Sequence, residues 1–207
     1  MDVNVIRQGS VATAKALKYP VNSSLPVLDV PQGLRGLGET VDRILCLNVS
    51  IACAFGYSQE LAEKWIDQEG LHETLVKSES KFIYESFGYP PKFWDSIEAL
   101  WAMVWSIGLV DVLEYGKPCS NDLVTMLPNL KTLESSSDFR SRAKLRPMSE
   151  ILPALDLAYC LHWSVRDAQL RNVKIPGKVK PHVITERRKA LEWLISEESW
   201  DEVQLDT

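Results

Sequence analysis

Residues 90–108, PPKFWDSIEALWAMVWSIG, predict the central helix of the fold. Pro90 and Pro91 suit a first helical turn, because the backbone N–H groups that proline lacks would have no intrahelical partner there. Apolar side chains then recur at steps of three and four residues and widen until they cover almost every side, namely Trp94, Ile97, Leu100, Trp101, Val104, Trp105 and Ile107. A helix that is apolar on nearly every side is normally buried. We therefore expect residues 91–108 at the centre of the molecule.

The rest of the chain predicts further helices around this one. Helical periodicity occurs over residues 39–55, 58–69, 149–170 and 183–198, with shorter segments after Ser78 and from Ser120 to Leu127. Residues 1–20 have a weak pattern and are expected to form an N-terminal arm, and the Pro- and Gly-rich residues 21–38 an extended connector. The expected fold class is mainly α, with residues 21–207 forming a single compact helical domain of about seven to nine helices and at most a minor strand pair.

Composition narrows the classes of function. The chain has 207 residues, of which 45% are hydrophobic, and its net charge is −5. Duplex nucleic-acid binders usually present a basic face, so nucleic acid is not expected as a partner, whereas an acidic chain suits a basic protein partner. No apolar stretch is long enough to span a bilayer, and the first residues do not resemble a signal peptide. We therefore expect a cytoplasmic protein without a membrane partner, and the oligomeric state stays open.

Metal and cofactor sites are not expected. The four cysteines form no CxxC pair, and three of them, Cys46, Cys53 and Cys160, lie in apolar runs that are typical of buried thiols. The histidines His72 and His182 are isolated from each other and from His162 in the sequence, without HxxxH or HExxH spacing. The sequence accordingly predicts neither a metal ion nor a cofactor.

The helix predicted over residues 149–170 carries an unusual set of polar groups. Asp156, Tyr159 and Arg166 lie along one ridge of that helix, and His162 borders the ridge. A carboxylate, a phenol, an imidazole and a guanidinium on one surface could perform general acid–base catalysis. The alternative interpretation is a network of ion pairs between packed helices.

Other polar residues extend this candidate set. Glu98 shares a face of the central helix with three tryptophans, where it could act as a general acid with a raised pKa or accept hydrogen bonds from indole or arginine groups in the core. Glu186 opens the last helix, where the helix dipole favours a carboxylate, and Arg187 follows it. The full candidate cluster is Glu98, Asp156, Tyr159, His162, Arg166, Glu186 and Arg187.

The C-terminal residues WDEVQLDT, 200–207, are expected to dock on the domain rather than to extend into solvent. Trp200 supplies an apolar anchor, and Asp201 and Asp206 supply charges. On charge grounds, the expected docking surface is the basic cluster Arg140, Arg142, Lys144 and Arg146.

Several of these motifs together resemble the largely bacterial family known as domain of unknown function 4272. The most specific parts are HWSVR at residues 162–166 and the closing WDEVQLDT, and the resemblance covers roughly residues 25–207. One departure is Glu192, where the family more often has Asn, which puts an amide contact at that position in doubt. The resemblance implies membership and a helical fold, and it assigns no active site.

Two hypotheses about function remain. The first is a protein-binding module, including an inhibitor or immunity protein against a basic toxin, which predicts a large exposed apolar or acidic patch. The second is a hydrolase-like enzyme using the candidate cluster, which predicts a pocket that at least three of those side chains line, with one shifted carboxylate. The sequence does not decide whether the chain is an enzyme.

Overall fold

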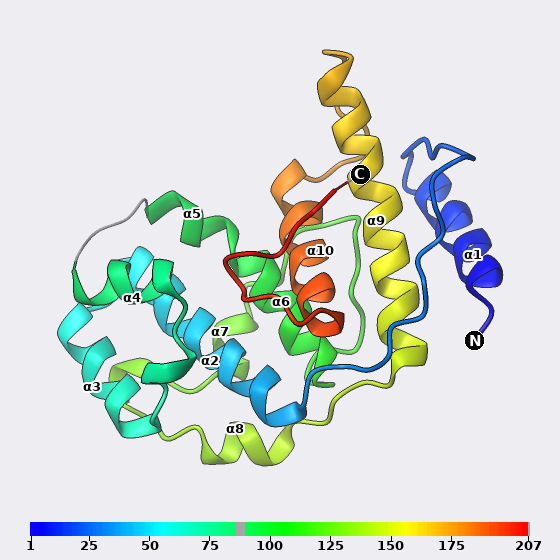
Figure 1. Ribbon diagram of the computed structural model, residues 1–207. Helices are drawn as coiled ribbons and strands as arrows, with labels where there is room; N and C mark the ends of the chain where they lie inside the picture. The colour runs from blue at the N-terminus through cyan, green and yellow to red at the C-terminus, as the bar shows by residue number, and fades with distance from the viewer. Residues whose placement is uncertain (86–89, 207) are drawn as a thin grey trace.

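The computed structural model describes residues 1–85 and 90–206, and Thr207, at the end of the predicted domain, lies outside them (Figure 1). Within the described residues there is no strand, which confirms the mainly α class, and seven of the α-helices have eight or more residues. The helices are α1 (Val3–Ala16), α2 (Leu37–Ala54), α3 (Gln59–Glu69), α4 (Lys77–Tyr84), α5 (Pro90–Asp95), α6 (Ile97–Ser106), α7 (Leu123–Met126), α8 (Ser137–Arg142), α9 (Met148–Leu170) and α10 (Pro181–Ile195), with 3-10 turns η1 (His72–Thr74) and η2 (Leu130–Thr132).

Helix α6 lies at the centre, in contact with α2 and α10, while α10 also packs against α9 (Figure 1). Most side chains of α6 are buried, including Leu100, Met103 and Trp105. The central position predicted for this segment is therefore confirmed. Its continuity was predicted wrongly, since the helix is interrupted at Ser96, whose hydroxyl donates to the carbonyl oxygen of Lys92 at 3.1 Å. A serine hydroxyl bonded back to the preceding turn commonly bends a helix.

Helix α9 is the longest element and supports the N-terminal segment. It begins at Met148, so Pro153 lies well inside the helix. Helix α1, within the segment expected to be an arm, packs along α9 (Figure 1). The turn after α1 places Tyr19 in the core, with 1% of its surface exposed. The N-terminal residues thus contribute a layer of packing to the outer face of α9.

A spanning helix needs about 20 predominantly apolar residues. None of the helices in residues 1–85 and 90–206 is both long and apolar enough to meet that requirement.

Candidate functional site

The candidate polar cluster divides into two sets of closed contacts. Asp156, Tyr159 and His162 lie around Arg7 and Arg188, whereas Glu98 pairs with Arg187. Asp156 is buried, and its Oδ1 accepts from Nη2 of Arg7 at 2.6 Å. Arg7 comes from α1 and also donates to the carbonyl oxygens of Leu25 and Pro26 at 2.7 and 2.8 Å. Tyr159 lies beside this pair, with its ring centroid 5.6 Å from the Arg7 guanidinium carbon. Arg7 thus satisfies the Asp156 carboxylate and ties α1 and the connector to α9.

His162 is held by a different arginine. Its Nδ1 accepts from Nη1 of Arg188 at 2.7 Å, and burial together with the Arg188 charge lowers the His162 pKa to about 4. Nδ1 must be unprotonated to accept this bond, so the imidazole is neutral with its proton on Nε2. Arg188 also donates to the backbone oxygen of Asp206 at 2.8 Å and to Glu192 at 3.1 Å. The position that departs from the family pattern, Glu192, is therefore a partner of Arg188.

Glu98 and Arg187 form a second buried pair, between α6 and α10. Oε2 of Glu98 lies 2.6 Å from Nη2 of Arg187, and Oε1 accepts from the backbone N–H of Cys119 at 2.9 Å. Arg187 also donates to the backbone oxygens of Glu114 and Lys117. All of these contacts hold the 114–119 loop against the two helices.

The two remaining members of the predicted cluster, Arg166 and Glu186, take no part in the hydrogen bonds given above. Arg166 is exposed on α9 and donates to Gln169 at 2.9 Å. Glu186 of α10 has a buried oxygen, Oε2, without a hydrogen-bond partner among the described residues, and burial raises its pKa. Within the described part of the chain, no group of three or more His, Cys, Asp and Glu side chains could hold a metal ion.

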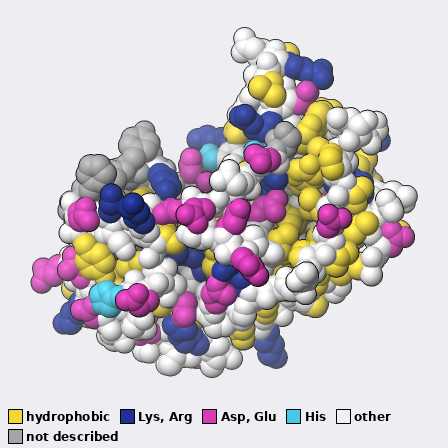
Figure 2. All heavy atoms as spheres, viewed as in Figure 1, with side chains coloured by type: hydrophobic (Ala, Val, Ile, Leu, Met, Phe, Trp, Pro, Cys, Tyr) yellow, Lys and Arg dark blue, Asp and Glu magenta, His cyan; other side chains and the backbone are white. Residues whose placement is uncertain are grey.

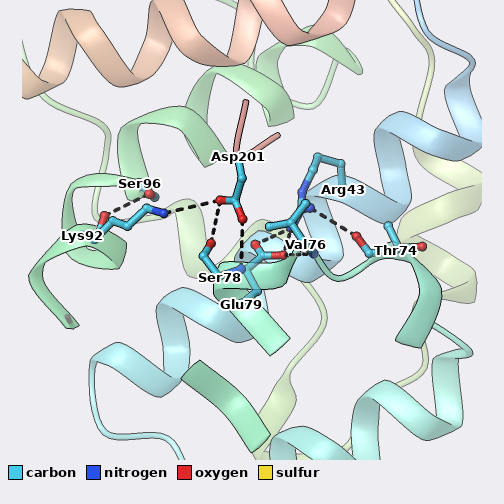
Figure 3. Close-up of polar contacts among 8 residues, drawn as sticks. All are labelled: Arg43, Thr74, Val76, Ser78, Glu79, Lys92, Ser96 and Asp201. Atoms are coloured by element: carbon cyan, nitrogen blue, oxygen red, sulfur yellow. Dashed lines mark hydrogen bonds and ion pairs between the residues drawn. The ribbon is translucent and has the colours of Figure 1, made fainter. Parts of the chain in front are cut away.

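The C-terminal segment docks in a place that the sequence did not predict. Trp200 is 4% exposed and meets the ring of Trp193 edge-on at a centroid distance of 5.8 Å. Asp201 accepts from the N–H and hydroxyl of Ser78 at 2.9 and 2.7 Å and lies 3.4 Å from Nζ of Lys92 (Figure 3). The expected docking on residues 140–146 is wrong, because Arg140 and Arg146 pair with Asp42 and Glu150 instead.

A buried ion pair missed by the sequence analysis lies beneath this tail. Arg43 of α2 donates to both carboxylate oxygens of Glu79 in α4, and the two side chains are 2% exposed (Figure 3). Glu79 also accepts from the N–H of Val76 at 3.1 Å, and the Arg43 guanidinium lies 5.5 Å from the ring centroid of Trp200. A charged residue at an otherwise buried helix position was the available signal for this pair. These contacts hold α2, α4 and the tail together, while Nε of Arg43 is buried without a hydrogen-bond partner among the described residues.

The structure has an open groove elsewhere. The end of α2 and the start of α3 line one side of it, and the segment from α7 to η2 lines the other. This α2–α7 groove has a volume of about 860 Å³. Phe55 is 66% exposed on one side of it, and Val124 is 68% exposed on the other. Nδ2 of Asn48 is buried in the groove lining without a hydrogen-bond partner among the described residues. The groove lining also includes Ala52, Tyr57, Leu61, Leu127, Pro128, Leu130, Lys131 and Glu134.

Trp94 extends the apolar surface next to this groove. Its side chain is 44% exposed, and its ring centroid lies 6.3 Å from that of Phe55. The indole N–H donates to the backbone oxygen of Ala54 at 2.8 Å. This bond fixes the ring at the end of α2, so the exposed aromatic surface has a defined position.

Comparison with known proteins assigns the family. The family model described as Domain of unknown function (DUF4272) matches residues 7–203. No curated protein and no solved structure matches the chain. The matched range includes Arg7, the partner of Asp156, whereas the resemblance found from sequence motifs began near residue 25. Because the match spans nearly the whole chain, this protein belongs to the family described as Domain of unknown function (DUF4272).

Proposed function

We propose that this protein is a protein-binding module whose α2–α7 groove receives an apolar segment of a partner protein. The observation that carries the proposal is the exposure of Phe55 and Val124 on the two sides of a groove of about 860 Å³. Large apolar side chains gathered around a concave surface are typical of interaction sites, whereas scattered ones are ordinary. An amphipathic helix that lays its apolar face into a hydrophobic groove is a recurring mode of peptide recognition.

A polar group in the groove supports the same proposal. Asn48 and Ala52 are one turn apart on α2, so they lie on the same face of that helix as Phe55. A buried donor without a partner destabilises a protein by about 1–3 kcal/mol. Because Nδ2 of Asn48 is shielded from solvent, a change of the Asn48 rotamer on binding would let an oxygen of the bound segment accept from it and remove that cost. The expected ligand therefore combines a bulky apolar side chain with a nearby oxygen acceptor.

The charge of the chain favours a basic partner. Its net charge of −5 would attract a positively charged protein at long range. An inhibitor or immunity role toward a basic toxin is the specific form of this proposal. The proposal also places the protein in a reducing compartment such as the cytoplasm, because all four cysteines are free thiols and three of them are buried.

The geometry gives less support to a hydrolase that uses the predicted cluster. General acid–base catalysis needs groups that can reach a substrate. The carboxylates of Glu98 and Asp156 are instead occupied by Arg187 and Arg7 in closed contacts. Glu186 retains an unpartnered oxygen, Oε2, but that atom is itself shielded from solvent. The binding hypothesis therefore has the stronger structural support.

A display experiment tests the groove with a defined probe. A phage-displayed library of random peptides is selected on the immobilised full chain, and synthetic peptides from the enriched group are titrated by fluorescence anisotropy. The test variants are Phe55→Ser, Val124→Ser and Asn48→Ala. Val5→Ser is the matched control, since Val5 is similarly exposed on α1. Thermal unfolding of each variant verifies that it is folded.

Peptide binding by the groove variants and by the control distinguishes the possible outcomes. We expect enriched peptides to carry bulky apolar residues and to bind the Phe55 and Val124 variants at least about tenfold more weakly than the wild type. Val5→Ser should bind them as the wild type does. Failure to enrich any peptide, or equal binding by the groove variants and the wild type, would overturn the proposal.

A further inference from the structure

The end of α9 and the segment that follows it form a basic projection from the fold. Residues 166–180 extend beyond the other helices (Figure 1). Five cationic side chains on this 166–180 projection are exposed, namely Arg166, Arg171, Lys174, Lys178 and Lys180. Asp167 is the single acidic residue of the segment and pairs with Arg171 at 2.9 Å. The projection thus carries a net charge of +4, although the whole chain carries −5.

Two aliphatic side chains are exposed among these cations. Leu170, the last residue of α9, is 79% exposed, and Val173 is 57% exposed. Figure 2 shows Lys and Arg side chains next to hydrophobic ones on this part of the molecule. Water contact with such apolar surface is unfavourable. A binding partner that contacts both the cations and the aliphatic groups would therefore remove this apolar surface from water.

The projection is fixed to the domain at its base. Gly177 has a φ of +81°, and a Cβ at this position would lie 2.0 Å from the hydroxyl oxygen of Tyr19. Only glycine allows the backbone to approach that buried ring so closely. Ile175 and Val179 also pack against the hydrophobic core. These contacts hold the loop in one arrangement, which lowers the entropy lost when it binds a surface.

We propose that the 166–180 projection binds the surface of an anionic lipid bilayer. Its lysines and arginines would contact lipid phosphate and carboxylate groups, while Leu170 and Val173 enter the interface. Polybasic segments are attracted to anionic leaflets, and exposed apolar groups strengthen such peripheral binding. This mode involves no spanning helix, and it departs from the expectation from sequence that no membrane takes part.

The composition of the projection favours a bilayer over nucleic acid. Single-stranded nucleic acid is commonly bound by aromatic side chains that stack on bases, and residues 166–180 contain no Phe, Tyr or Trp. The exposed aliphatic pair, by contrast, has a direct use at a lipid interface. Because the whole chain has a net charge of −5 and the projection has +4, the remainder of the chain has a net charge of −9. An anionic bilayer should repel that remainder, which would orient the molecule with the projection toward the membrane.

Vesicle cosedimentation of the full chain tests this inference. The probes are vesicles of phosphatidylcholine alone and of equal parts phosphatidylcholine and phosphatidylserine. One double variant, Lys174→Gln with Lys178→Gln, removes two charges, and another, Leu170→Ser with Val173→Ser, removes the aliphatic pair. Val5→Ser again serves as the control for loss of an exposed valine elsewhere. A fluorescent single-stranded DNA is titrated in parallel.

We expect binding to the vesicles with phosphatidylserine and little binding to phosphatidylcholine alone. Removing two charges should weaken it about 30-fold, removing the aliphatic pair about tenfold, and a salt concentration of about 1 M should abolish it. Absence of binding dependent on phosphatidylserine would overturn the inference. The inference would also be overturned if the protein bound DNA as strongly as the vesicles and the aliphatic substitutions left DNA binding unchanged, since that result indicates a surface that binds any polyanion. Neither outcome affects the α2–α7 groove, which uses different residues.

Discussion

Glu98 of α6 and Arg187 of α10 are 89 residues apart in sequence and form an ion pair 2.6 Å long in the core. Both side chains are almost completely shielded from solvent, with 2% and 0% of their surface exposed. The remaining hydrogen-bonding groups of the pair are used by the backbone of the 114–119 loop. Removing one member leaves the other charge buried without compensation, which is far more costly than losing an exposed pair.

The first prediction follows from this difference between a buried ion pair and an exposed one. Glu98→Gln should lower the free energy of unfolding by about 3–5 kcal/mol, because Arg187 would remain charged in the core. Urea unfolding measured by circular dichroism tests the change. Glu150→Gln is the control, since Glu150 pairs with Arg146 one helical turn away while 46% exposed, and such pairs contribute less than about 1 kcal/mol. Equal unfolding midpoints for the two variants would contradict a structural role for Glu98.

The second prediction concerns acid pH. The unfolded chain protonates His162 near its ordinary pKa of 6.5, whereas the folded protein does so only near 4. Protons therefore favour the unfolded chain between these values. The stability from the neutral imidazole is present above pH 6.5 and should be lost as the pH falls toward 4, by about 3 kcal/mol in total.

Variants at two histidines test this dependence. Unfolding in urea is measured at several pH values between 4 and 7 for the wild type, His162→Gln and His72→Gln. Glutamine does not titrate, so His162→Gln should lose that part of the slope of stability against pH. The exposed His72 serves as the control, because His72→Gln leaves His162 in place and should therefore retain the part of the slope that His162 causes. A slope that His162→Gln leaves unchanged would show that another group causes the acid sensitivity.

Local periodicity predicted the helices well, because each one depends on side chains close in sequence. The predicted helix 149–170 corresponds to α9 at Met148–Leu170, and the predicted 39–55 helix to α2 at Leu37–Ala54. The break at Ser96 was missed, since a serine with apolar neighbours gives no distinct signal in a spacing pattern. That break separates Trp94 from the buried face of α6 and leaves it partly exposed.

The polar cluster was harder to predict, because its geometry depends on which helices pack together. The ridge of α9 did place Asp156, Tyr159 and His162 near one another. Their partners, Arg7 and Arg188, come from other helices, so spacing along α9 could not identify them. Net charge likewise could not locate the docked tail, whose position depends on a buried ring and a few hydrogen bonds. The α2–α7 groove was missed for the same reason, since it forms where the segment from α7 to η2 leaves part of α2 uncovered.

The third prediction tests the docked tail. Trp200→Ala should lower the free energy of unfolding by about 3–5 kcal/mol, as expected for a large buried ring. The contact with Trp193 would be lost, and Arg43 would lose the aromatic face above which it lies. Val124→Ser is the control, because an exposed side chain away from special contacts changes stability by less than about 0.5 kcal/mol. Equal stability of the two variants would mean that the tail contributes nothing to the core.

The fourth prediction tests the contact between Gly177 and Tyr19. Gly177→Ala should be strongly destabilising for two reasons, namely the positive φ and the overlap of the new Cβ with the Tyr19 ring. Gly56→Ala separates them, since Gly56 has a φ of +94° but nothing within 4 Å of an added Cβ, so its cost should be only about 1 kcal/mol.

A double variant completes the test by removing the ring. Tyr19→Ala is itself destabilising because the side chain is buried, but in that background Gly177→Ala should cost no more than Gly56→Ala does in the wild type. Chemical denaturation of the four proteins in this cycle gives the coupling energy between the two positions. A coupling near zero would mean that the loop and the ring are not in close contact. A coupling of about 2 kcal/mol or more would establish that Tyr19 fixes the base of the 166–180 projection.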